Sequence, residues 1–182
     1  MQFILILLFL GVPAASALAS GFTVTSSDIH NGATIPMAQV LNRCGGGNQS
    51  PALSWSGAPQ GTASYAVTMF DPDAPTGHGW WHWTLVNIPA GLSNLPENAG
   101  TARSGALPAG AVQGRNDFGF SNYDGPCPPM GAAPHRYVVT VYALTVPRLA
   151  IGPQASGPTV EAALHRVTLA TATLVGRWGR GN

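Results

Sequence analysis

The stretch SYAVTMFDPDAPTGHGWWHWTLVNIP, residues 64–89, contains two predicted strands and the loop that joins them. The first strand, residues 64–70, and the second, residues 81–88, are rich in β-branched and aromatic side chains. Between them, prolines and glycines in residues 71–80 interrupt any regular structure. This stretch therefore predicts a strand–loop–strand unit. Its two aspartates, two histidines and three tryptophans lie within residues 71–83, and this crowding needs an explanation.

The second strand carries a histidine among tryptophans. Strict alternation of side chains places His82 and Thr84 on one face of this strand, and Trp81 and Trp83 on the other. An imidazole between two indoles is partly desolvated, so its pKa moves readily. His82 is therefore either a core histidine with satisfied hydrogen bonds or a functional group.

The loop presents two carboxylates on a stiff backbone. Asp71 and Asp73 flank Pro72, and Pro75 follows closely. Such a pair can share a proton, bind a metal, line a ligand pocket or cap backbone amides in a turn, and the last role is the common one for Asp-Pro-Asp. His78 lies between glycines, so it lacks the helical geometry that would pair it with a second histidine around a metal.

The rest of the chain also reads as mainly β. GFTVTSSDI, residues 21–29, and TATLVGRW, residues 171–178, predict outer strands, and RYVVTVYALTV, residues 136–146, is apolar on both faces and predicts a central strand. One helix is expected over residues 158–170. Residues 89–129 have little periodicity and predict either a disordered segment or a long functional loop held at its ends. Cys127 near the C-terminal end of this segment favours the second.

Composition excludes several classes of protein. The 182 residues fit one domain, and the 23 glycines and 16 prolines favour an all-β chain with many turns over a helical bundle. Charged residues make up 8% of the chain and the formal net charge is +1. This balance argues against nucleic-acid binding and against a polybasic membrane anchor, because both need a concentrated basic face.

The N-terminus predicts export. FILILLFLGV, residues 3–12, is a short apolar run, and small residues at 17–19 suit a signal peptidase. We expect a signal peptide over residues 1–19 and a single mature domain over residues 20–182. The alternative is a retained anchor, but the apolar run falls short of the roughly 20 residues that span a bilayer. No integral membrane span is expected in the mature chain, which would be periplasmic or secreted.

The chain has two cysteines, Cys44 and Cys127. In an exported protein an even number favours a disulfide over two separate buried thiols. Closing so long a loop would stabilise the fold by about 4 kcal/mol through chain entropy. Neither cysteine has a second cysteine or a histidine at ligand spacing, so no zinc site is expected.

A second cluster, GPCPPMGAAPHRYVV, spans residues 125–139 and brings His135 to the start of a strand. Histidines and aspartates at strand ends could converge on a polar pit that suits a small anion such as a phosphate headgroup. No serine or cysteine has the pattern of a nucleophile elbow. An acid–base hydrolase using Asp71 and His135 is the enzymatic alternative, and we expect no enzyme, no cofactor and no metal.

Both clusters resemble the phosphatidylethanolamine-binding protein family, in its bacterial and archaeal Raf kinase inhibitor-like branch, the YbhB/YbcL group. The resemblance is carried by DPDAPTGHGWWHWTLVNIP, residues 71–89, by GPCPPMGAAPHRYVVTVYAL, residues 125–144, by CGGGNQSPALSW, residues 44–55, and by LHRVTLATATLVGRW, residues 164–178. It implies an antiparallel β-sandwich with Greek-key connections and an anion pocket at one end.

By motif position, the resemblance implies that Asp71, His82 and His135 form the polar floor of the pocket. Asp73 could instead serve mainly in the turn, and Arg136 is expected to point the other way from its strand. The ligand-binding set that the resemblance implies is Asp71, Asp73, Pro75, Trp80, His82, Pro128, Pro129, His135 and Tyr137.

Two functions follow as expectations. The first is a non-enzymatic binding protein for a small anion or a phospholipid headgroup. The second is a protein-interaction module, such as a protease inhibitor or a regulator, which acts through its surface loops. Inhibition of a cytosolic kinase is not carried over, because an exported chain would not meet such a partner. The oligomeric state stays open, with a homodimer among the alternatives.

Overall fold

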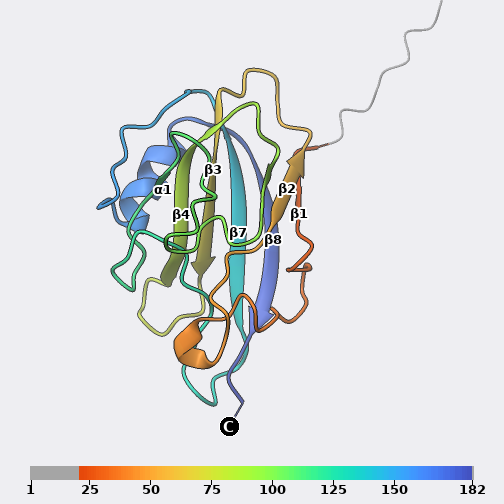
Figure 1. Ribbon diagram of the computed structural model, residues 1–182, viewed down its shortest axis with the longest axis vertical. Coiled ribbons are helices and arrows are strands. Elements are labelled where there is room, and N and C mark those ends of the chain that lie inside the picture. Colours follow the sequence, from red (N-terminus) through yellow and green to blue (C-terminus); the bar gives the residue numbers. More distant parts are fainter. Residues whose placement is uncertain (1–20, 182) are drawn as a thin grey trace, which may run out of the picture.

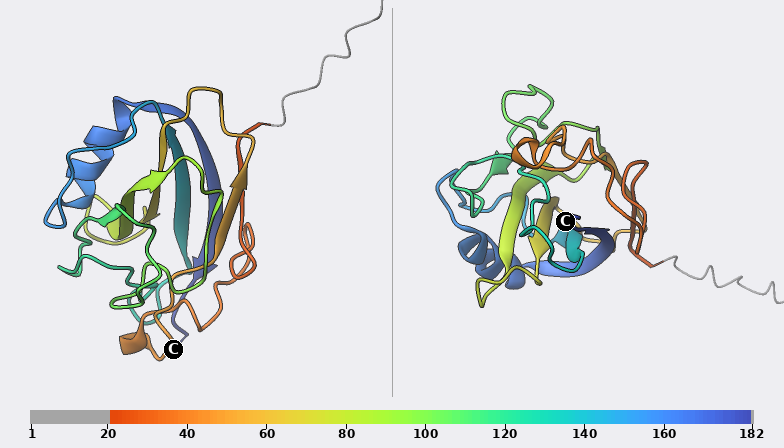
Figure 2. Two further views of the ribbon diagram at one scale, coloured as in Figure 1. Left: turned by 45° about the horizontal axis from the view of Figure 1, so that its top comes forward. Right: turned by 90° about the horizontal axis from the view of Figure 1, so that it is seen from below.

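The computed structural model describes residues 21–181, so the predicted signal segment, residues 1–19, lies outside the described residues. Two antiparallel sheets pack face to face (Figures 1 and 2). The small sheet has the order β1 (Thr23–Thr25), β2 (Leu53–Ser56), β5 (Asn94–Leu95). The large sheet has the order β6 (Val112–Gln113), β4 (Trp80–Pro89), β3 (Ser64–Asp71), β7 (His135–Leu144), β8 (Thr168–Trp178). The predicted β-sandwich is confirmed.

The main core lies between the sheets. Trp55 from the small sheet faces a layer from the large sheet that includes Met69, Trp83 and Val141, all fully or almost fully buried. Burying side chains of this size is the main source of stability in such a domain. The run predicted as central, residues 136–146, forms β7, which has a strand on either side.

A smaller core lies under the helix α1 (Gly157–His165), on the other face of the large sheet. Val160 and Leu164 pack there against Ala66 and Val86. The helix is shorter than the predicted 158–170. After His165 the chain turns, and Thr168 already pairs with Leu144 of β7. The β-branched residues at this point favour the strand, and sheet pairing outweighs helical periodicity.

A β-bulge at the start of β4 changes which face of the sheet its side chains point to. Met69 pairs with Trp83, but the next residue, Phe70, pairs with Trp81, so His82 is the extra residue. His82 therefore faces the sandwich interior on the same side as Trp83, while Trp81 packs against Phe70 on the helix side. The prediction from strict alternation was wrong here, because a bulge shifts the side-chain period by one.

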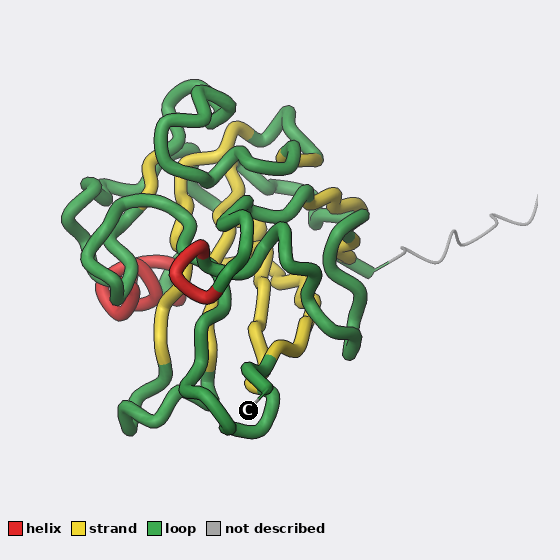
Figure 3. Tube along the Cα trace, turned by 60° about the horizontal axis from the view of Figure 1, so that its bottom comes forward, coloured by secondary structure: helices red, strands yellow, loops and turns green. Residues whose placement is uncertain are grey.

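Residues 89–129 consist mostly of loops, interrupted by the short strands β5 and β6. Loops make up much of the molecule outside the two sheets (Figure 3). Tyr123 is fully buried within them, and its hydroxyl donates a hydrogen bond of 2.7 Å to the Gln39 carbonyl. The predicted disulfide between Cys44 and Cys127 is present, and it ties these loops to the short 3-10 helix at Asn42–Cys44. The prediction of a loop held at its ends is confirmed.

We predict that Gly157→Ala destabilises the protein by about 1–3 kcal/mol. Alanine has a higher helix propensity than glycine, but a Cβ at Gly157 would overlap the ring of Trp81 on β4. Urea unfolding should show the loss, whereas Gly152→Ala, where a Cβ meets nothing within 4 Å, should have little effect. Equal stability of the two variants would contradict this packing.

Candidate functional site

Three neighbouring strands bring their polar residues to the same end of the large sheet. β3 ends at Asp71, β4 begins at Trp80, and β7 begins at His135. Because β4 and β7 both run antiparallel to β3, the end of β3 lies beside the starts of its two neighbours. The two clusters that are far apart in the sequence therefore meet in space.

A buried pair joins two of these strands. Nδ1 of His135 lies 2.8 Å from Oδ2 of Asp71, and the two residues are only 7% and 3% exposed. Since a carboxylate oxygen accepts, Nδ1 of His135 carries the proton and donates it to Asp71. The second oxygen of Asp71 accepts the backbone N–H of Asp73 at 2.8 Å. Both oxygens of this buried carboxylate are thus engaged, which offsets the cost of removing it from water.

His82 is held by a backbone group of the long loop. Its Nδ1 donates to the Asp124 carbonyl at 2.7 Å, and its ring packs edge-on against Tyr137 and Phe118. Burial lowers the pKa of His82 below its usual value, so the imidazole is neutral at physiological pH. With Nδ1 protonated, Nε2 is the hydrogen-bond acceptor of this neutral ring.

The Asp124 side chain fixes the loop that carries this carbonyl. Its two carboxylate oxygens accept hydrogen bonds from the amides of Asn48 at 3.0 Å and Asn116 at 2.8 Å. The side-chain oxygen of Asn116 in turn accepts the backbone N–H groups of Phe118 and Phe120. This network positions both the partner of His82 and the aromatic ring of Phe118.

These residues enclose a cavity of about 230 Å³ at the end of the sandwich. Eight of the nine predicted ligand-binding residues line it, and Asp73 is the one that does not. The predicted residues on its wall are Asp71, Pro75, Trp80, His82, Pro128, Pro129, His135 and Tyr137.

Sequence reasoning missed two important wall residues, Arg43 and Phe118. Arg43 reaches the cavity because the neighbouring Cys44 is bonded to Cys127, which is itself on the wall. The predicted disulfide was a usable signal for Arg43, since it places the residues next to Cys44 beside the Pro128 loop. Nothing in the local pattern around Phe118 distinguishes it from an ordinary loop aromatic.

Two residues of the wall each carry a buried polar atom without a hydrogen-bond partner among the described residues: the hydroxyl of Tyr137 and Nε1 of Trp80. Burial, reinforced by the charge of Asp71, raises the pKa of Tyr137, so its hydroxyl keeps its proton at neutral pH. A buried donor that makes no bond costs free energy, and such atoms in a cavity indicate where a ligand supplies the acceptor.

Asp73 points away from the cavity and binds Arg136. Its carboxylate accepts from Nε and Nη2 of Arg136 at 2.9 and 2.7 Å, and from the backbone N–H of the same residue at 2.8 Å. These bonds lower the pKa of Asp73 from 3.8 to about 2. Arg136 points opposite to His135 on β7, as predicted.

The comparisons with known proteins agree with this geometry. The family described as Phosphatidylethanolamine-binding protein matches residues 25–179. This chain belongs to the phosphatidylethanolamine-binding protein family. The predicted resemblance is therefore confirmed. Within residues 21–181, no helix is long and apolar enough to cross a membrane.

Several members of the family are similar over most of their length. The protein YbcL of Escherichia coli K12 is 49% identical over 87% of this chain and 88% of its own, and YbhB of the same organism is 45% identical over 82% and 94%. The crystal structure of YbcL superposes with a TM-score of 0.86 at 47% identity, covering 88% of this chain and 99% of that one. LppC of Mycobacterium tuberculosis, named as a lipoprotein, is 37% identical over 90% of this chain and 73% of its own.

We predict that the Asp73–Arg136 pair stabilises the fold above pH 4 and loses this contribution as the pH falls towards about 2. The folded-state pKa of Asp73 is lower than its unfolded value, so protonation favours unfolding in that window. The side chains are 31% and 48% exposed, so solvent screening keeps this contribution small.

The measurement is a double-mutant cycle with Asp73→Asn and Arg136→Gln, unfolded in urea at several pH values. The coupling energy between the two sites should be present at pH 5 and decline between about pH 4 and 2. A coupling energy that stays constant across this window would contradict the assignment.

Proposed function

We propose that this protein is an exported binding protein that holds a small anion, such as a phosphate headgroup, in the cavity at the end of its sandwich. The observation that carries the proposal is that two residues of the cavity wall, Tyr137 and Trp80, each have a buried donor without a hydrogen-bond partner, and that the cationic Arg43 lies on the same wall. Donors and a guanidinium suit the acceptor oxygens of an anion. The volume is below the roughly 300–1,000 Å³ typical of drug-sized ligands, so it suits a headgroup rather than a whole lipid.

The charges of the residues that line the cavity favour one anionic ligand. Asp71 is engaged by His135 and by a backbone amide, so its carboxylate is already satisfied. Arg43 forms no ion pair with any carboxylate among residues 21–181. The guanidinium of Arg43 is therefore the cation left for a ligand, and the rings of Trp80 and Phe118 partly exclude water and strengthen that attraction.

Binding rather than chemistry is supported by the state of the reactive groups. Cys127 is in a disulfide, and the Thr76 hydroxyl donates to the Gly79 carbonyl at 2.7 Å. Among the described residues, the Thr76 hydroxyl makes no hydrogen bond to a carboxylate or an imidazole, the contact that an activated nucleophile requires. Asp71 and His135 bond to each other instead of to a nucleophile.

Export is supported by two observations. The Cys44–Cys127 disulfide suits an oxidising compartment. The relative LppC, whose name describes a lipoprotein, indicates that members of this family occur outside the cytosol. With the apolar run at residues 3–12, these favour a periplasmic or secreted location.

The test is titration of the purified protein with phosphoethanolamine and with inorganic phosphate, followed by calorimetry and by NMR of the His82 ring. Tyr137→Phe and Arg43→Gln should each weaken binding about tenfold, because each removes one charge-assisted hydrogen bond. Tyr142→Phe, on the outer face of the same strand, and the exposed Arg166→Gln are matched controls that should leave it unchanged. No shift at His82 with either ligand would overturn the proposal.

A second candidate function is recognition of a protein through the surface loops. Phe120 and Met130 are 60% and 64% exposed on the loops beside the cavity, where a protein partner could cover them. If these loops inhibit a protease, Phe120→Ser and Met130→Ser should weaken inhibition while phosphate binding stays intact. A protease panel that the unaltered protein does not inhibit would remove this candidate.

A further inference from the structure

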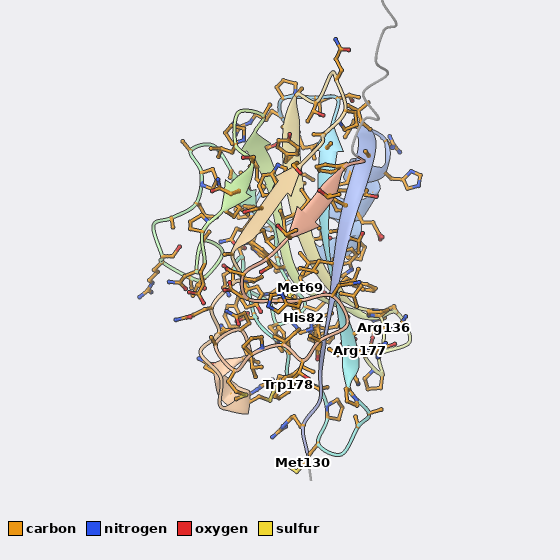
Figure 4. The ribbon with its side chains drawn as sticks, turned by 90° about the vertical axis from the view of Figure 1, so that its right-hand side faces the viewer. Met69, His82, Met130, Arg136, Arg177 and Trp178 are labelled. Carbon is orange, nitrogen blue, oxygen red and sulfur yellow. A yellow bond between two sulfur atoms is a disulfide. The ribbon has the colours of Figure 1, made fainter. Side chains whose placement is uncertain are left out.

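A second concavity lies on the outer face of the large sheet, near the end that carries the cavity. It is an open cleft of about 510 Å³, and Figure 4 shows two of its residues, Arg136 and Arg177, close together and to one side of His82. The residues that line it are Asp73, Ala133, Pro134, His135, Arg136 and Arg177. We call it the outer cleft, and of its residues only His135 also lines the inner cavity.

The outer cleft has an excess of positive charge. Arg136 and Arg177 are direct cross-strand partners in the pairing of β7 with β8, and both are exposed. Like charges in such positions repel each other and need a counter-charge. Asp73 supplies one carboxylate and uses it on Arg136. Among residues 21–181, no acidic side chain forms an ion pair with Arg177.

Hydrogen bonds fix the backbone of Arg177 and the guanidinium of Arg136. The N–H of Arg177 donates to the Ala33 carbonyl at 2.8 Å, and its own carbonyl accepts from Ile35 at 2.8 Å. On its other edge, Arg177 is paired with β7. Arg136 is fixed through Nε and Nη2, which leaves its Nη1 without a partner among the described residues.

We propose that the outer cleft is a second binding site, for a compact oxyanion such as a carboxylate or a phosphate or sulfate ester. The planar guanidinium of Arg177 presents paired N–H donors that match two oxygens of such a group, and Nη1 of Arg136 supplies a further donor. One anionic group balances the one uncompensated guanidinium. Because the cleft is open, the oxyanion can belong to a larger molecule.

This site does not depend on the proposed function of the inner cavity. The side chains of Arg136 and Arg177 are not on the wall of that cavity, and the donors proposed there, on Tyr137 and Trp80, are not on the wall of the outer cleft. Each site can therefore be removed while the other is kept.

The experiment is NMR titration of the whole mature protein with acetate, inorganic phosphate and sulfate, read at the side-chain Nε–H groups of Arg136 and Arg177. Sodium chloride at the same ionic strength is the control for screening. We expect saturable shifts of both groups with at least one oxyanion and not with chloride. Saturation by acetate alone would identify a carboxylate ligand. Saturation by phosphate or sulfate would identify a phosphate or sulfate ester.

Two variants define the site. Arg177→Gln should weaken binding, read at Arg136, by about tenfold, and the exposed Arg166→Gln on the opposite end of the sheet is the matched control that should not. Asp73→Asn should strengthen binding, because it removes the carboxylate that competes with the ligand for Arg136. Shifts of the His82 ring should be unchanged in Arg177→Gln.

Two results would overturn the inference. The first is that chloride reproduces the shifts, or that no oxyanion saturates them. The second is that Arg177→Gln and Arg166→Gln bind equally well. The variant Tyr137→Phe distinguishes the two sites. If it loses the NMR shift of the His82 ring but keeps that of the Arg177 Nε–H group, the inner site has failed and the outer one has not.

Discussion

The buried hydrogen bond between Asp71 and His135 is the constraint on which the rest of this end of the molecule depends. It joins the end of β3 to the start of β7, and a carboxylate at this depth would cost several kcal/mol if it lost its partner. The other oxygen of Asp71 fixes the backbone of Asp73, and Asp73 in turn fixes Arg136. One short turn therefore holds a buried pair and an exposed pair at the same time.

The pleat of the strands sends these pairs to opposite faces. His135 points into the sandwich and Arg136 points out, as successive residues of a strand do. The inner face becomes a small cavity with aromatic walls and unpartnered donors, while the outer face becomes an open cleft with two arginines. Strand residues supply one part of each surface, and loop residues supply the rest.

Three features complete the inner cavity. The disulfide brings Arg43 to the wall, the Asp124 network positions the carbonyl that holds His82, and the bulge in β4 turns His82 inward. These features place a cation, a neutral imidazole and an aromatic ring around one space. The similarity to YbcL and YbhB extends over nearly the whole described chain, so this scaffold is that of the phosphatidylethanolamine-binding protein family.

The sequence by itself predicted the strands of residues 64–89, the central position of β7 and the family, and it favoured a bond between the two cysteines. Eight of the nine residues predicted for the ligand site line the cavity, because they sit in long contiguous motifs. Tertiary structure decided the inward turn of His82, the end of the helix at His165, the place of Arg43 and the outward direction of Asp73. The reason is physical: local patterns encode periodicity and turns, whereas register shifts and contacts between distant segments are set by packing and by pairing of buried charges.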